Sequence, residues 1–243
     1  TQQGNDFAKP FLKAELEKQV GLPVEVDLFK LRYNNTSLKI IINDALKIDV
    51  RSMFSLLGMT CDGTYSIYAN NFVYNEINLK QANINGEFEG EHDNIYVNGK
   101  GNTFNAPMNY YLRIVDGDAN RITVELKDMK LSDILKFAKQ PAIAKGKVDA
   151  NVTIPTLVKS ELNTHGIINL SNITFDDVLM KKLYKVSIPK TLQMAGIIDA
   201  NLTDTQIIGG ADMHTKLANV TLKNLHFNKE TQYISSHYIV DIL

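Results

Sequence analysis

The stretch Gly146-Lys147-Val148-Asp149-Ala150-Asn151-Val152-Thr153 returns later in the chain as Gly196-Ile197-Ile198-Asp199-Ala200-Asn201-Leu202-Thr203. Both copies fit the pattern Gly-x-(Val/Ile)-Asp-Ala-Asn-(Val/Leu)-Thr. Apolar and polar residues alternate in each copy, as they do in a strand with one buried face. A short segment with helical periodicity precedes each copy, at residues 131–135 and 175–179. The pattern therefore predicts a unit made of a short helix, a glycine and a strand.

A fainter third unit lies nearer the start of the chain. There Val50–Gly58, read as helical over Ser52–Leu57, precedes the strand pattern of Gly63–Asn70. We expect degenerate repeats at about 45–75, 129–154 and 173–204. Repeats of this kind are typical of a stacked or meandering β architecture, and they argue against a single catalytic pocket.

Composition limits the function classes. The chain has 243 residues, with 44% hydrophobic and 22% charged side chains and a net charge of -1. Such a charge balance disfavours a nucleic-acid partner, which demands a basic surface, and provides no polybasic membrane patch. Cys61 is the only cysteine, so no internal disulfide is possible. The chain lacks an initiator Met, a signal peptide and an apolar run of about 20 residues, and we interpret it as a fragment whose start has been removed.

Periodicity along the chain predicts one long helix followed by strands. Phe7–Val20 carries an apolar stripe, with Pro10 in the expected first turn and Gly21 at the end. From Val24 the period changes to two, because Val24, Val26 and Leu28 alternate with charged residues. Later in the chain we expect short helices at 132–139, capped by Ser132, and at 176–183, and a turn or bulge at Gly209-Gly210.

The middle of the chain predicts a β meander with one apolar face. Tyr110–Val115 and Ile122–Lys127 fit a hairpin whose turn lies at 116–120. Glycine recurs on the apolar parity of the strands before it, within 82–90 and 95–101. A glycine there permits strong curvature or the close approach of another group.

These patterns predict a mostly β fold. We expect a long, antiparallel, strongly twisted meander that forms an open groove, with an N-terminal helix and short helices between repeat units. Residues 1–22 would dock on the end of the sheet, and residues 23–243 would form one β domain. The alternative is a closed sandwich, in which the same apolar residues pack against one another.

Three stretches together resemble the AsmA-like family, which is related to TamB and the bridge-like lipid-transfer proteins. They are the Gly146–Thr153 strand, the run Leu162-Asn163-Thr164-His165-Gly166-Ile167-Ile168-Asn169-Leu170, and the step Ile173-Thr174-Phe175-Asp176-Asp177-Val178. Phe11–Val24 is similar to the helix and Gly-x-Pro-Val that follow the family's membrane anchor. Thr164-His165 departs from the tight Leu-Asn-Gly turn of that family.

The resemblance implies a non-enzymatic periplasmic protein of a diderm bacterium, tethered to the inner membrane by an anchor outside this fragment. Its partners would be phospholipids or other lipids, with further repeats or envelope proteins at its ends. It would carry acyl chains and contribute to lipid transport or outer-membrane homeostasis. No point motif of the family can be transferred residue by residue.

The candidate site is the apolar strand face, because an acyl chain needs apolar contact and no fixed polar partner. We expect its wall to contain Ile84, Phe88, Val97, Met108, Tyr110, Leu112, Ile114, Ile122, Val124, Leu126, Val148 and Val152. The alternative function is a structural or adhesive module that binds protein or glycan through its polar face, where Tyr96 and Tyr111 would be exposed.

The sequence gives little support for catalysis, metal binding or nucleic-acid binding. The five histidines are scattered, no nucleophile motif or phosphate-binding loop is present, and we expect no metal, no cofactor and no nucleic-acid partner. Asp116-x-Asp118-x-Asn120 has calcium-loop spacing but lacks the later Glu, so a hairpin turn is favoured. Asp149 and Asp199 are expected at turns or strand ends. Asn151 and Asn201 fit an acidic glycosylation sequon, but a strand is a poor acceptor.

Overall fold

The computed structural model describes residues 2–32, 35–55, 57–74, 77–103, 105–137, 140–155, 163–189 and 191–243. The helices are α1 (Gln2–Val20), α2 (Leu131–Phe137) and α3 (Asp177–Tyr184). The strands are β1 (Val24–Lys30), β2 (Thr36–Ile42), β3 (Leu46–Ser55), β4 (Thr60–Tyr74), β5 (Ile77–Glu91), β6 (Asn94–Thr103), β7 (Ala106–Val115), β8 (Asp118–Lys130), β9 (Ala144–Ile154), β10 (Thr164–Phe175), β11 (Met194–Leu202), β12 (Gln206–Thr215), β13 (Ala218–Asn228) and β14 (Ile234–Ile242).

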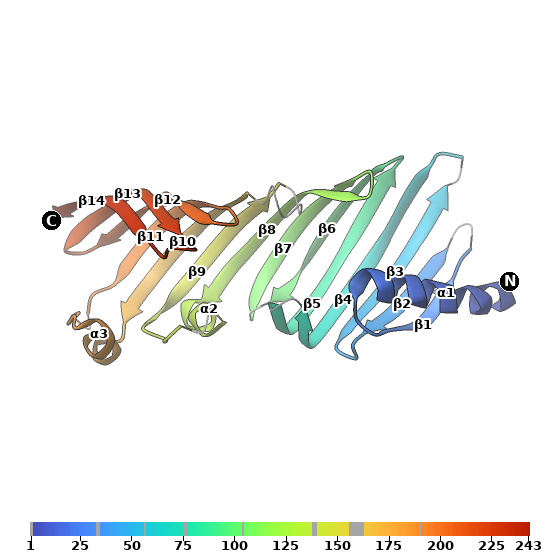
Figure 1. The fold of residues 1–243 in the computed structure, drawn as a ribbon, viewed down its shortest axis with the longest axis horizontal. Helices are drawn as coiled ribbons and strands as arrows, with labels where there is room; N and C mark the ends of the chain where they lie inside the picture. Colours follow the sequence, from blue (N-terminus) through green and yellow to red (C-terminus); the bar gives the residue numbers. More distant parts are fainter. Residues whose placement is uncertain are drawn as a thin grey trace. The chain divides into compact units, whose positions relative to one another are not determined.

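The strands form one antiparallel sheet in the order β1 to β14, so sheet neighbours are also neighbours in the chain (Figure 1). The sheet is open and does not close into a barrel. The predicted open meander is therefore confirmed, and the closed-sandwich alternative is wrong.

The chain divides into two compact units. The first contains residues 1–105 and 109–119, and the second contains 106–108 and 120–243. The expected single domain over 23–243 stays a prediction.

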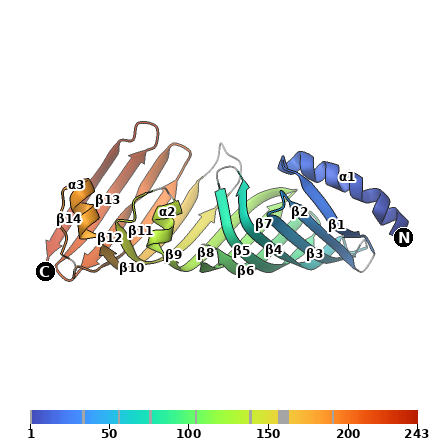
Figure 2. The same cartoon turned by 90° about the horizontal axis from the view of Figure 1, so that it is seen from below.

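Helix α1 starts earlier than expected and lies beside β1 (Figures 1 and 2). Asn5 Oδ1 accepts a hydrogen bond from Leu31 N at 3.2 Å, and Lys9 Nζ donates to Asp27 O at 3.3 Å. These bonds hold the first turns of the helix along β1, so the helix begins at Gln2. Pro10 therefore lies inside the helix, and its predicted place in the first turn is corrected. At its other end, Glu17 Oε1 accepts from Val24 N at 3.0 Å.

The two short helices before the repeated strands are confirmed. Helix α2 precedes β9 and α3 precedes β11, as predicted for the units 129–154 and 173–204. Asp176 caps α3, since its Oδ1 accepts from Leu179 N at 3.0 Å. Helix α2 already begins at Leu131, so the prediction of Ser132 as its cap is wrong. Residues 138 and 139, at the predicted end of this helix, lie outside the described residues.

The helix expected over Ser52–Leu57 in the faint third unit is wrong. Strand β3 continues to Ser55 and pairs with β4, with Ser52 opposite Gly63 and Phe54 opposite Cys61. Leu57 is 95% exposed, so no apolar helical stripe is buried at this point. The apolar spacing from Val50 to Leu57 fits both the helical and the strand period, and the pairing of β3 with β4 decides for the strand.

Strand register gives each unit an apolar face and a polar face. In the first unit, Ile40, Ile48, Ile67 and Ile84 oppose one another across β2 to β5. In the second unit, Val124 opposes Val152 and Ile168 opposes Ile198. We call this surface the apolar face of each unit. Residues of the opposite parity, such as Asp49, Ser66 and Asn85, form the polar face.

Irregularities in register change some expected side-chain directions. A shift between Val26 and Leu28 places Leu28 opposite Lys39, so the predicted alternation fails at Leu28. Asp128, Asn172 and Asn224 have φ of 56°, 53° and 53° beside shifts in β8, β10 and β13. Of the turn or bulge predicted at Gly209-Gly210, the bulge is borne out, because both residues lie inside β12 at a register shift against β13.

The β7–β8 connection is a tight turn. Asp116 and Gly117 both have positive φ, of 52° and 85°, as a two-residue hairpin turn requires. Asp118 and Asn120 belong to β8. The expected hairpin turn is therefore confirmed, but it is shorter than residues 116–120.

Candidate functional site

The residues predicted to line the groove lie on the apolar faces of the two units. Those in the first unit are Ile84, Phe88, Val97, Tyr110, Leu112 and Ile114, and those in the second are Met108, Ile122, Val124, Leu126, Val148 and Val152. Phe88 opposes Val97 across β5 and β6, and Val124 opposes Val152 across β8 and β9. All except Val148 are half-buried, so they keep part of their apolar surface accessible.

Two tyrosines lie flat on the apolar face of the first unit. A Cβ on Gly86 would lie 2.3 Å from Tyr65 Oη, and one on Gly99 would lie 2.6 Å from the Tyr110 ring. Tyr65 and Tyr110 therefore occupy the space that side chains at these glycines would fill. The expected close approach of another group is confirmed, and that group comes from the protein itself.

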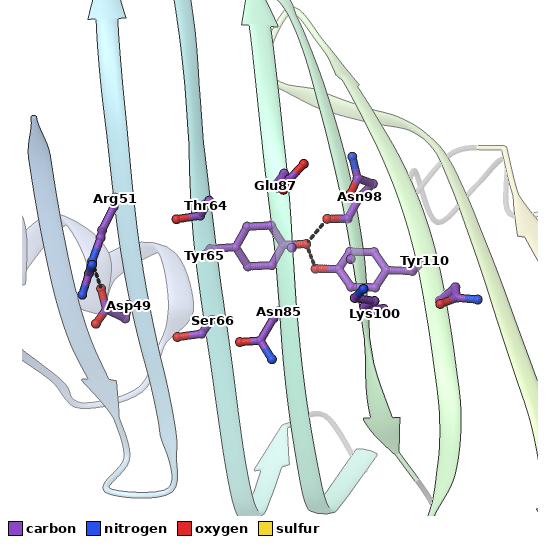
Figure 3. A pocket seen from close by; sticks show the side chains of 13 residues that line it. Asp49, Arg51, Thr64, Tyr65, Ser66, Asn85, Glu87, Asn98, Lys100 and Tyr110 are labelled. Atoms are coloured by element: carbon purple, nitrogen blue, oxygen red, sulfur yellow. Dashed lines mark hydrogen bonds and ion pairs between the residues drawn. The ribbon is translucent and has the colours of Figure 1, made fainter. Parts of the chain in front are cut away.

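The hydroxyl groups of this tyrosine pair are satisfied within the sheet. Tyr65 Oη donates to Asn98 O at 2.9 Å, which leaves it to accept a hydrogen bond from Tyr110 Oη (Figure 3). Burial raises the pKa of both phenols, and the bond donated to Tyr65 raises the pKa of Tyr110 further. Both phenols remain neutral at physiological pH, so the rings present uncharged surface to a ligand.

Helix α1 covers part of the apolar face in the first unit. Leu16 and Val20 pack against a buried cluster that includes Val24, Ile40 and Ile42. The exposed fractions of these three side chains are 2%, 7% and 5%. Ile84 borders this cluster and is only half-buried. The accessible part of this face therefore begins where the helix-covered cluster ends.

Helix α2 covers part of the apolar face in the second unit. Leu131 and Ile134 pack on Ala106, Met129 and Val148. Val148 is only 3% exposed. It is therefore a core residue, and its assignment to a ligand-contacting wall is corrected. Val124, Leu126 and Val152 remain half-buried.

The first unit carries two hollows that the sequence did not predict, lined mainly by residues of the polar face and in part by Tyr65, Tyr110 and Phe88 of the apolar face. The larger has a volume of about 660 Å³ and lies over strands β3 to β7 (Figure 3). The smaller, of about 420 Å³, adjoins it and shares Arg51, Thr64 and Glu87. The only signal in the sequence is the recurrence of asparagine on the polar parity of neighbouring strands, at Asn85, Asn98 and Asn109.

Asp149 and Asp199 lie in the middle of β9 and β11, so their assignment to turns or strand ends is wrong. Asp149 Oδ1 accepts from Asp128 N at 2.7 Å. Asp199 Oδ1 lies 2.8 Å from His165 Nε2. The two carboxylates have different partners and do not form an acid–base pair. Asn151 and Asn201 also lie on these strands, as the argument against glycosylation assumed.

Among the described residues, no group of three or more His, Cys, Asp or Glu side chains is arranged to hold a metal ion. Cys61 is half-buried, and burial together with the neighbouring Asp62 carboxylate raises the pKa of its thiol. A raised pKa lowers the thiolate fraction and so the reactivity of this cysteine.

Comparisons with protein-family models, with curated proteins and with solved structures give no match. In the part of the chain that the structure describes, no helix is both long and apolar enough to span a bilayer. The family resemblance and the localisation that it implies therefore stay predictions.

Proposed function

We propose that the protein binds the acyl chains of phospholipids or other lipids along its apolar strand faces and contributes to lipid transport between membranes. The observation that supports this proposal is the open sheet whose apolar side chains, beyond the clusters under α1 and α2, remain half-exposed in each unit. Large exposed apolar surfaces on soluble domains mark sites of interaction.

The chemistry of the apolar face suits hydrocarbon. Each methylene group removed from water contributes about 0.8 kcal/mol and needs no hydrogen-bond partner. Phe88, Val97 and Leu112 offer only carbon, and the Tyr65–Tyr110 pair has its hydroxyl groups already occupied. A chain that lies on this face therefore meets little unpaired polar surface.

The cellular setting rests on the resemblance to AsmA-like proteins. We place the protein in the periplasm, anchored at the inner membrane through a segment outside residues 1–243. Lipids and envelope proteins would be its partners, and we propose no enzymatic activity. The alternative function, an adhesive module, was predicted as a closed sandwich, and the open sheet excludes that form.

The test compares bound lipid in purified wild-type protein and in single variants of each unit. Leu112→Asp for the first unit and Val124→Glu for the second introduce a charge where an acyl chain would lie. We expect wild-type protein to carry co-purified lipid in native mass spectrometry and each variant to lose most of it, because burying a carboxylate against hydrocarbon is unfavourable.

Thr123→Glu is the matched control, because Thr123 precedes Val124 in β8 and has the opposite parity. This variant should keep its lipid, and far-ultraviolet circular dichroism should show that all variants are folded. Wild-type protein without lipid, or equal loss in Thr123→Glu and Val124→Glu, would contradict the proposal.

A further inference from the structure

The polar face of the first unit presents two rows of side chains with a hollow between them. One row contains Arg51, Thr64, Glu87 and Asn98, which oppose one another across β3 to β6. The next contains Asp49, Ser66, Asn85 and Lys100, in the same register. The 660 Å³ hollow lies between these rows. Asn109 of β7 also lines it, as do four residues of the intervening parity, Tyr65, Gly86, Gly99 and Tyr110. Its volume is in the range of small-molecule sites.

Most of the polar side chains around this hollow are available to a ligand. Within the described residues, the side chains of seven lining residues make no hydrogen bond or ion pair to the protein, namely Thr64, Ser66, Asn85, Glu87, Asn98, Lys100 and Asn109. Amide and hydroxyl groups both donate and accept. This set therefore matches a ligand whose own polar groups also do both.

The charged side chains that line the hollow balance. Arg51 and Lys100 are cationic, and Asp49 and Glu87 are anionic. Asp49 pairs with Arg51, at 3.9 Å from Nε to Oδ1, and with Lys39 outside the lining, at 3.2 Å from Nζ to Oδ2. A phosphate or nucleic-acid site needs a clear excess of positive charge, which this surface lacks. The balance favours an uncharged ligand.

Two exposed tyrosines lie beside the hollows on the same face. Tyr96 is two residues from Asn98, and Tyr111 is two residues from Asn109. Their ring centroids are 6.5 Å apart with an interplanar angle of 31°, and the residues are 39% and 38% exposed. The Arg113 guanidinium lies 5.6 Å from the Tyr96 ring centroid, while its Nη2 donates to Asn94 Oδ1 at 3.0 Å. These contacts hold an aromatic platform beside the polar groups.

We propose that this surface binds a neutral oligosaccharide. Sugar hydroxyl groups donate and accept hydrogen bonds, as the free Asn, Ser and Thr side chains do. The C–H face of a pyranose ring carries partial positive charge, which the negative π-faces of Tyr96 and Tyr111 attract. The elongated arrangement of two adjoining hollows beside two rings suits several linked sugars better than one.

This binding activity is separate from the proposed lipid binding. Tyr110 and Phe88 of the apolar face also line the hollows, but the residues substituted in the two tests, Leu112 on one side and Asn98 and Tyr111 on the other, lie on opposite parities of their strands. The two proposals can therefore fail independently of each other.

The experiment titrates the full chain with maltohexaose, cellohexaose and chitohexaose, and with hexagalacturonate as an anionic comparison. Calorimetry and tyrosine fluorescence report binding, and the absence of tryptophan makes the fluorescence signal specific to tyrosine. We expect at least one neutral hexasaccharide to bind with a Kd below about 1 mM. Tyr111→Ala and Asn98→Ala should each weaken binding at least tenfold.

Tyr238→Ala is the control, since Tyr238 is an exposed tyrosine of β14 in the second unit and lines neither hollow. This variant should bind as the wild type does. The proposal is overturned if no neutral hexasaccharide binds, if hexagalacturonate binds more tightly than all of them, or if Tyr238→Ala weakens binding as much as Tyr111→Ala. Because Asn98 and Tyr111 lie on different strands, a folding failure of one variant leaves the other as a test.

Discussion

Strands β9 and β11 contain almost the same sequence, yet their aspartates have different roles. Asp149 of β9 accepts a hydrogen bond from the backbone N–H of Asp128, where β8 departs from regular register. Asp199 of β11 faces β10 where the register is regular, and its carboxylate lies against the His165 side chain instead. The neighbouring strand therefore decides what the repeated residue does.

The physical reason is the availability of a backbone donor. In a regular ladder, the neighbouring N–H groups are already bonded to carbonyl oxygens. At a bulge, one N–H leaves the ladder, and a nearby carboxylate can accept from it. A repeated sequence thus keeps its strand geometry while its polar side chains take partners that depend on the strand beside them.

The glycines that open the two copies should give the largest effects. Gly146 has φ of +148°, and a Cβ there would lie 2.4 Å from Ile173 Cδ1, whereas one on Gly196 would lie 2.3 Å from Asp212 O. We expect Gly146→Ala and Gly196→Ala to lower the free energy of unfolding by about 2–4 kcal/mol each. The loss should be larger for Gly146→Ala, which adds backbone strain, and urea denaturation measures both.

Gly166 of β10 provides the control, because a Cβ there would meet only Val152 Cγ2, at 3.9 Å. Gly166→Ala should change stability by less than about 1 kcal/mol. A loss equal to that of Gly196→Ala would show that glycine matters here for a reason other than space.

The two aspartates should give a smaller difference. Asp149→Ala should cost about 1 kcal/mol, because it leaves the Asp128 N–H without its charged acceptor. Asp199→Ala should cost less than about 0.5 kcal/mol, since both partners of its contact with His165 are exposed to solvent. Asp149→Asn retains an acceptor oxygen and should recover much of the loss. Equal midpoints for Asp149→Ala and Asp199→Ala in urea would remove the distinction between the two strands.

The ion pair of Lys147 should contribute the smallest difference in stability between β9 and β11. Its Nζ donates to Asp128 Oδ1 at 2.6 Å, and this hydrogen bond raises the pKa of the ammonium group. The second copy has Ile197 at this position. Both partners of the ion pair are largely exposed, so Lys147→Ala should move the urea midpoint by less than about 0.2 M. The shift should vanish in about 1 M NaCl, where such pairs are screened.

Side-chain parity was predictable from sequence because it is a local property. Once Val124 and Val152 are assigned to strands, alternation fixes which residues share a face with each. The short helices before β9 and β11 were also predictable, since their apolar spacing fits a helix, whereas the cap at Asp176 was not predicted. Val50–Leu57 has spacing that fits both helix and strand, and only its pairing with β4 resolves it.

Lateral register was not predictable, and the polar hollows depend on it. Arg51, Thr64 and Glu87 come from three strands and meet only because those strands pair in one particular alignment. A shift such as the one at Asp128 moves every later partner, and Asp or Asn is equally common in ordinary turns. The burial of Val148 likewise depends on α2, whose docking position the strand pattern does not contain.

The strand order has a consequence for how such a chain can change over time. Each strand from β2 to β13 bonds to its immediate predecessor and successor, so a duplicated or deleted hairpin would disturb only the junctions on either side of it. Pairing between sequence neighbours also lets assembly proceed locally, without first closing long loops. The length of the sheet is therefore a property that recombination can adjust in whole hairpins, while the alternation of its two surfaces is inherited intact.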